Sequence, residues 1–100
     1  MHTPINIPPD RLAAFCTKWK VAELSLFGSV LREDFEADSD VDVLVEFLPD
    51  APYGIDEHVE MITELQDIFG RPVDLVRAGS LKNPFRRSEI MSTRRVIHAA

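Results

Sequence analysis

The sequence predicts an α/β fold, in which short strands alternate along the chain with amphipathic helices. Three apolar runs have the length and residue content of buried strands, at residues 24–27, 41–47 and 72–77. Between and around them, apolar residues recur at intervals of three and four, which is the helical period. This alternation is typical of a sheet covered by helices. Strand order does not follow from it.

The first helix is expected to begin at Pro8-Pro9-Asp10, after a loose lead-in over residues 1–7. Proline is favoured in a first helical turn, and an acidic residue suits the positive end of the helix dipole. One apolar stripe follows at helical spacing: Leu12, Phe15, Cys16 and Trp19. We therefore expect Trp19 and Cys16 to be core residues rather than a base-stacking platform and a nucleophile.

The second helix is expected between a Pro- and Gly-containing break and Gly70, a good C-cap. Its predicted buried stripe is Ile55, Val59, Ile62, Leu65 and Phe69. His58 is expected to have a surface or helix-packing role. After a loop at residues 78–82, Asn83-Pro84 is a typical helix start, with the helix over residues 85–92 and a closing edge strand over residues 95–98.

Composition limits the classes of protein that this chain can be. One hundred residues with 45% hydrophobic and 28% charged side chains suit one soluble domain over residues 1–100. No apolar run approaches the length of a membrane span, and the single Cys16 excludes an internal disulfide, so a cytoplasmic protein is expected. The net charge of −6 disfavours a general nucleic-acid binder. Residues 71–100 are nevertheless basic, with seven Lys or Arg and two acids.

Two carboxylates stand at the beginning of the second predicted strand. Side chains alternate along a strand, so Asp40 and Asp42 share one face, while Val41, Val43 and Val45 point to the other. Two neighbouring carboxylates repel one another, so either one is protonated or a cation lies between them. No basic residue adjoins them in sequence, which favours a bound metal ion. Asp74 lies on the next strand, on the face opposite Val73 and Leu75.

Gly28 and Ser29 follow the first predicted strand and are expected to turn it into a short helix. Such a turn leaves backbone N–H groups and a positive dipole end that favour a phosphate. Glycine permits close approach of the backbone, and the serine hydroxyl adds a donor. A phosphate cradle beside a divalent-metal site indicates chemistry on a nucleoside triphosphate. Arg32 would steady the triphosphate or pair with a neighbouring acid, and the sequence does not decide between these roles.

At residues 26–32, 38–47 and 71–76 the chain resembles the nucleotidyltransferase superfamily related to DNA polymerase beta. Within it, the chain is most similar to the minimal nucleotidyltransferases, small bacterial and archaeal proteins often encoded beside a HEPN-domain partner. The resemblance implies a small mixed β-sheet flanked by helices, the nucleotidyltransferase-like fold. It also implies two Mg²⁺ ions bound by Asp40 and Asp42, with Asp74 as the third carboxylate. Glu33 stands where many relatives have glycine.

The resemblance further implies an antitoxin that transfers AMP from ATP to a Tyr hydroxyl of a HEPN-domain toxin. A chain of this size has few residues left for an acceptor pocket, so a partner or a second copy would supply the acceptor surface. Other interpretations stay open: a non-catalytic module that neutralises a toxin by contact, nucleotidyl transfer to a small molecule or an RNA end, and a plain interaction domain.

Overall fold

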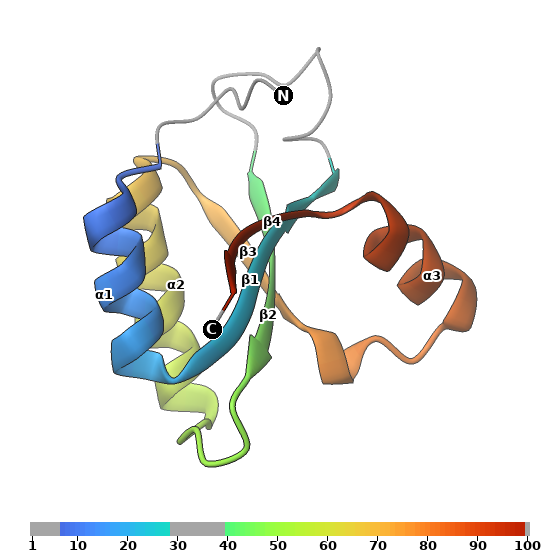
Figure 1. Ribbon diagram of the computed structural model, residues 1–100, viewed down its shortest axis with the longest axis horizontal. Coiled ribbons are helices and arrows are strands. Elements are labelled where there is room, and N and C mark those ends of the chain that lie inside the picture. Colours follow the sequence, from blue (N-terminus) through green and yellow to red (C-terminus); the bar gives the residue numbers. More distant parts are fainter. Residues whose placement is uncertain (1–6, 29–39, 100) are drawn as a thin grey trace.

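The computed structural model describes residues 7–28 and 40–99. Figure 1 shows α1 and α2 side by side on one face of the sheet, with α3 on the other face and further from it. The elements in chain order are α1 (Pro9–Trp19), β1 (Val21–Phe27), β2 (Val41–Phe47), α2 (Ile55–Phe69), β3 (Val73–Arg77), the 3₁₀ turn η2 (Ala78–Ser80), α3 (Pro84–Thr93) and β4 (Arg95–Ala99). The predicted alternation of strands and helices is confirmed, except that the short helix expected after Ser29 lies outside the described residues.

The sheet is mixed, in the strand order β3-β2-β1-β4. β1 runs antiparallel to both β2 and β4, whereas β2 and β3 are parallel. Parallel neighbours need a crossover, and α2 supplies it between β2 and β3. The closing edge strand expected over residues 95–98 is present as β4, paired with β1. A small mixed sheet flanked by helices is therefore confirmed as the fold.

One face of the sheet forms the main core with α1 and α2. The alternating residues Val41, Val43 and Val45 of β2 are fully buried there, as the strand period predicts. The predicted stripe of α1 is buried in the same cluster: Leu12, Phe15, Cys16 and Trp19. Ile7, at the end of the expected lead-in, packs against this core, and residues 1–6 lie outside the described residues.

The connection from α1 to β1 is a single residue. Lys20 adopts a left-handed conformation with φ of 54° and ends the helix. β1 therefore begins at Val21, earlier than the predicted residue 24, and Val21 is paired with Phe47. The predicted strand is too short because Glu23 and Ser25 interrupt its apolar pattern. Both side chains point to the opposite face of the sheet from Leu24 and Leu26.

The predicted apolar stripe of α2 is partly wrong. Leu65 and Phe69 are buried, and Ile62 packs against the core, but Ile55 and Val59 are 85% and 57% exposed. Met61 takes the buried position instead, with 0% exposure. The helix carries two overlapping apolar stripes, and its contacts with α1 and β3 select the one through Met61 and Leu65. Gly70 is the left-handed C-cap, as predicted, with φ of 69°.

The other face of the sheet carries a smaller apolar cluster under α3. Its buried members are Phe27, Leu44, Ala78 and Ile90. α3 begins at Pro84, one residue before the predicted helix, and Asn83 is its N-cap, with the side chain accepting hydrogen bonds from the backbone N–H groups of Phe85 and Arg86. It extends to Thr93, one residue beyond the predicted end, and η2 occupies the start of the expected loop. No helix in the described ranges is long and apolar enough to cross a membrane.

Candidate active site

Two of the three predicted carboxylates, Asp42 on β2 and Asp74 on β3, lie side by side in the sheet. Asp42 is the Cα partner of Asp74 in the parallel β2–β3 pair, and the partner of Phe27 in the antiparallel β1–β2 pair. Residues in register across a sheet project to the same face, and adjacent strands lie about 4.8 Å apart. The two carboxylates are therefore neighbours on the α3 face. Asp42 is half-buried and Asp74 is exposed, which confirms that Asp74 points away from the core.

Gly28 closes this end of β1 in a conformation that a side chain would disturb. Its φ is +73°, in the left-handed region. A Cβ placed on Gly28 would overlap Oδ2 of Asp42, so the carboxylate lies directly against the glycine backbone. The bend predicted after the first strand is therefore present at Gly28. Ser29 and Arg32, the other two predicted nucleotide contacts, lie outside the described residues.

Asp40 differs from the other two acids. It precedes β2 instead of belonging to it, and it is exposed. Within residues 7–28 and 40–99, no three His, Cys, Asp or Glu side chains are gathered in a group that would hold a metal ion. The structure thus brings Asp42 and Asp74 together but does not collect all three predicted ligands into one cluster.

The chemistry of these side chains suits Mg²⁺. Magnesium prefers hard oxygen ligands and is usually held by one or two carboxylates together with substrate phosphates, rather than by an all-protein cage. Asp42 and Asp74 supply two carboxylates in register, and Oδ2 of Asp42 lies against the backbone of Gly28, on the side where a Cβ would stand. The residues therefore fit a divalent ion that arrives with a nucleotide.

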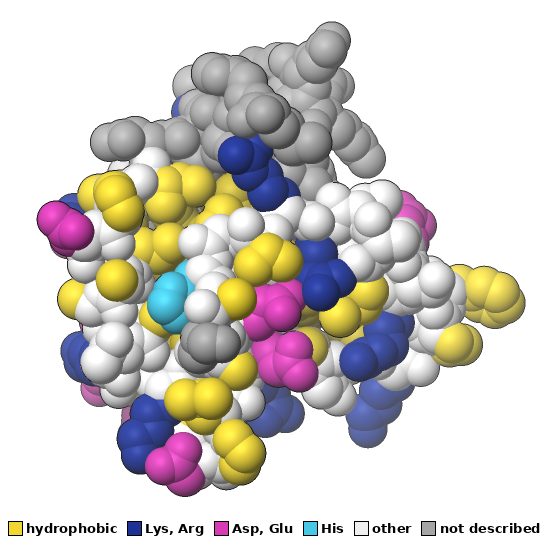
Figure 2. Space-filling view, viewed as in Figure 1, with side chains coloured by type: hydrophobic (Ala, Val, Ile, Leu, Met, Phe, Trp, Pro, Cys, Tyr) yellow, Lys and Arg dark blue, Asp and Glu magenta, His cyan; other side chains and the backbone are white. Residues whose placement is uncertain are grey.

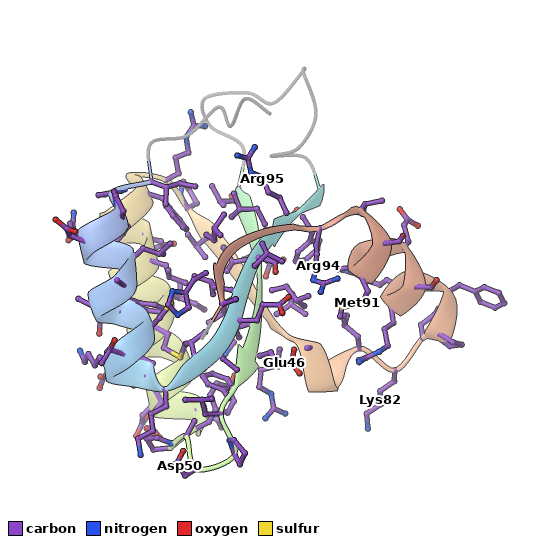
Figure 3. The ribbon with its side chains drawn as sticks, viewed as in Figure 1. Glu46, Asp50, Lys82, Met91, Arg94 and Arg95 are labelled. Atoms are coloured by element: carbon purple, nitrogen blue, oxygen red, sulfur yellow. The ribbon has the colours of Figure 1, made fainter. Side chains whose placement is uncertain are left out.

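A hollow of about 540 Å³ opens beside Asp42, between the sheet and α3. This is within the usual size range of small-molecule sites. Figure 3 shows Met91 and Arg94 on the side of α3 that faces the sheet. The hollow is lined by Phe27, Gly28, Asp42, Arg86, Glu89, Ile90 and Thr93.

The contribution of α3 to this hollow was not predicted from the sequence. Arg86, Glu89, Ile90 and Thr93 recur at the i, i+3, i+4 and i+7 positions of one helix face. That spacing was available in the sequence, but without the strand order nothing placed this face opposite Asp42. Ile90 is buried and so fixes which face of α3 is turned toward the sheet. Arg86 and Glu89 are exposed at the rim of the hollow.

The groups that sequence analysis assigned to structural roles lie away from the hollow. Burial raises the pKa of the Cys16 thiol to about 12, which excludes a thiolate nucleophile at neutral pH. Trp19 lies in the core and its Nε1 donates to Glu64 over 3.3 Å. His58 contacts the hydroxyl of Tyr53 through Nδ1, in agreement with the packing role expected of it.

Comparison with known proteins matches these features to one enzyme class. A family model described as a nucleotidyltransferase domain matches residues 12–97. This range contains the Gly28 bend, the Asp42–Asp74 pair and α3. The fold and the family match thus define a nucleotidyltransferase.

The relatives are small proteins of similar length. The chain is 37% identical over 73 residues, 73% of each chain, to a protein of Methanocaldococcus jannaschii named "Putative protein adenylyltransferase MJ1379". It is 38% identical over 66 residues, 66% of this chain and 65% of the relative, to "Protein adenylyltransferase MntA" of Thermococcus cleftensis. A solved structure described as "Structure of putative minimal nucleotidyltransferase" matches with a TM-score of 0.69 and 26% identity, over 90% of this chain and 87% of that one. The chain belongs to the nucleotidyltransferase domain family, as one of its minimal members.

Proposed function

We propose that this chain transfers AMP from ATP to a Tyr hydroxyl of a HEPN-domain toxin, in a Mg²⁺-dependent reaction, and so acts as an antitoxin. The observation that carries the proposal is the register of Asp42 and Asp74 beside the Gly28 bend. Relatives at 37% and 38% identity that are named as protein adenylyltransferases support a protein acceptor and AMP as the group transferred.

A toxin partner is supported by the open hollow beside Asp42 and by the description of a fold neighbour. A crystal structure described as a toxin–antitoxin with AMP-PNP matches 94% of this chain and 75% of that one, with a TM-score of 0.71 and 18% identity. That likeness concerns the fold alone. The described residues of this chain leave an open hollow beside Asp42 rather than an enclosed acceptor pocket, so a partner surface is needed to complete the site.

The roles of the residues follow from their positions and chemistry. Asp40, Asp42 and Asp74 would hold two Mg²⁺ ions, which when bound offset phosphate charge and make the acceptor hydroxyl more acidic. Gly28 and Ser29 would hold the β- and γ-phosphates, since a Gly backbone admits an oxygen at close range. Arg32 would steady the same phosphates or pair with a nearby acid.

In the transfer itself, the Tyr oxygen forms a bond to the α-phosphorus and the bond from that phosphorus to pyrophosphate breaks. Asp74 is exposed on the α3 face, where an acceptor can reach it, and its carboxylate receives the hydroxyl proton. Asp42, held against Gly28, keeps its carboxylate in a fixed place beside the reacting phosphate.

The test is incubation of the purified chain with labelled ATP, Mg²⁺ and the protein encoded beside it. We expect label on the partner, lost when the partner's acceptor Tyr is replaced by Phe. Asp42→Asn should reduce labelling by roughly 10³-fold or more, because several kcal/mol of charge stabilisation in the transition state depend on the metal site. Asp67→Asn is the matched control, since Asp67 lies on α2 and is paired with Arg11 on the other face of the sheet.

The outcomes separate the proposal from its alternatives. Labelling that is as fast with Asp42→Asn as with the unchanged chain would rule out the carboxylate site. Stable binding of the partner without label would favour neutralisation by contact. Label that appears on an RNA end or a small molecule, and not on the partner, would mean that this molecule is the acceptor instead of the toxin.

A further inference from the structure

The wall of the hollow formed by α3 carries one cation and one acid, Arg86 and Glu89. Within the described residues, the guanidinium of Arg86 and the carboxylate of Glu89 form no ion pair and no side-chain hydrogen bond. They stand three positions apart on one helix, which is a spacing at which opposite charges can pair. Both line the hollow instead.

Two other arginines near this face are engaged in structural contacts. Arg87 donates from Nη1 to the carbonyl of Ala78 over 2.8 Å, which fastens η2 to α3. Arg94 pairs with Glu23 over 3.0 Å and joins the end of α3 to β1. Figure 2 shows acidic and basic side chains close together where the sheet faces α3. Arg86 differs from both because it lines the hollow and, within the described residues, its guanidinium forms no hydrogen bond or ion pair.

The hollow needs a cation if it receives a triphosphate. The charged side chains that line it are Asp42, Glu89 and Arg86, so Arg86 is the positive group among its described lining residues. An Arg guanidinium is always charged and offers several donors that match phosphate oxygens. Gly28, the bend expected to cradle phosphates, borders the same hollow.

We propose that α3 is the second wall of the nucleotide site and that Arg86 contacts the phosphate chain of the nucleoside triphosphate across the hollow from Gly28 and Asp42. This inference rests on the proposed function, because it names a contact for that function's substrate. It assigns to α3 a binding role in addition to its packing through Ile90.

The experiment measures equilibrium affinity by calorimetry for AMP-PNP and for adenosine, in buffer with Mg²⁺, without turnover. We expect Arg86→Ala to weaken AMP-PNP binding by about tenfold, a typical effect of losing a hydrogen bond to a charged group. Adenosine binding should stay unchanged because adenosine has no phosphates. Arg86→Lys should recover part of the loss, since it keeps the charge but not the planar fork.

The matched control is Lys82→Ala. Lys82 is exposed on the segment before α3 and points away from the space between this helix and the sheet (Figure 3). Lys82→Ala removes the same charge as Arg86→Ala. Equal weakening of AMP-PNP binding by both variants would therefore mean a general charge effect and would overturn the contact. Equal weakening of AMP-PNP and adenosine by Arg86→Ala would also overturn it.

The two proposals fail in different ways. If the unchanged chain binds AMP-PNP and labels its partner while Arg86→Ala binds AMP-PNP equally well, the role of Arg86 is wrong and the proposed function stands. If the unchanged chain binds no AMP-PNP, both are wrong. Because the Arg86 side chain forms no hydrogen bond or ion pair within the described residues, thermal unfolding of Arg86→Ala should match that of the unchanged chain.

Discussion

The two faces of the sheet serve different purposes, although the same strands build both. The face covered by α1 and α2 is called the closed face here because two helices cover it (Figure 1), and its apolar side chains form one continuous cluster that includes Leu24, Val43 and Leu65. The face toward α3 has four buried apolar residues, an ion pair and an open hollow that contains Asp42. Because side chains alternate along β2, one strand contributes valines to the core and Asp42 to the hollow. Stability is therefore concentrated on one face, and the candidate site on the other.

A matched pair of core truncations tests whether the two faces of the sheet contribute unequally to stability. Leu65→Ala removes a side chain with 0% exposure from the closed face and should cost about 2–5 kcal/mol of unfolding free energy. Ile90→Ala, at 7% exposure in the smaller cluster, should cost about 2 kcal/mol, because fewer neighbours surround the cavity it leaves. Urea unfolding measures both. Equal losses would mean that the two faces share stability evenly.

Gly28→Ala tests the junction between the two faces. The substitution places a methyl group against Asp42 at a φ of +73°, so it should cost about 1–2 kcal/mol of stability by backbone strain. Displacement of the carboxylate should also lower partner labelling by roughly 10²-fold, since small misplacements at a reacting centre have effects of this size. Gly79→Ala is the control, because a Cβ there meets no atom within 4 Å. Unaltered labelling by Gly28→Ala would show that Asp42 need not lie against the bend.

The closed face should also show a dependence on alkaline pH. Burial raises the pKa of Cys16 from 9.0 to about 12, so above pH 9 the unfolded chain loses this proton while the folded chain keeps it. Folding stability is then fully present below pH 9 and falls above it, by up to ~1.4 kcal/mol per pH unit. Chemical unfolding between pH 8 and pH 10.5 would show the slope. The same series on Cys16→Ala should lack this contribution, and an identical slope in both proteins would assign it to other groups.

The smallest expected effect concerns the start of α3. The Asn83 side chain caps two backbone N–H groups, so Asn83→Ala should cost about 1 kcal/mol. Since α3 lines the hollow, hydrogen exchange should rise at its first turn while protection in α1 stays as it was. Equal deprotection of α1 and α3 would show that the two faces open together.

The closed face was largely predictable from sequence, because hydrophobic periodicity records burial directly. The stripe of α1, the valines of β2 and the placement of Asp74 opposite Val73 and Leu75 all follow from the helical and strand periods. The failure at Ile55 and Val59 has a physical reason. Apolar residues on α2 cover more than one face, and periodicity alone cannot tell which stripe the neighbouring elements will cover.

The candidate site was predictable in part. Asp42 and Gly28 were identified by their positions at strand ends, and Asp74 by the family resemblance and its strand face; the structure places Asp42 beside both Gly28 and Asp74. Arg86 was not identified as a site residue, because its position opposite Asp42 depends on where α3 crosses the sheet. That placement is a property of strand order, which the sequence does not encode in any local pattern. Asp40, Ser29 and Arg32 stay predictions as ligands of the metal and the nucleotide.

We propose above that Asp42 and Asp74 together hold a divalent ion with the nucleotide. Electron paramagnetic resonance can measure this binding with Mn²⁺ as the ion, in the presence of AMP-PNP. The account predicts bound Mn²⁺ in the unchanged chain and in Asp67→Asn, with binding lost or weakened by about tenfold or more in Asp42→Asn and in Asp74→Asn. Mn²⁺ binding that is equally strong in all four proteins would contradict it.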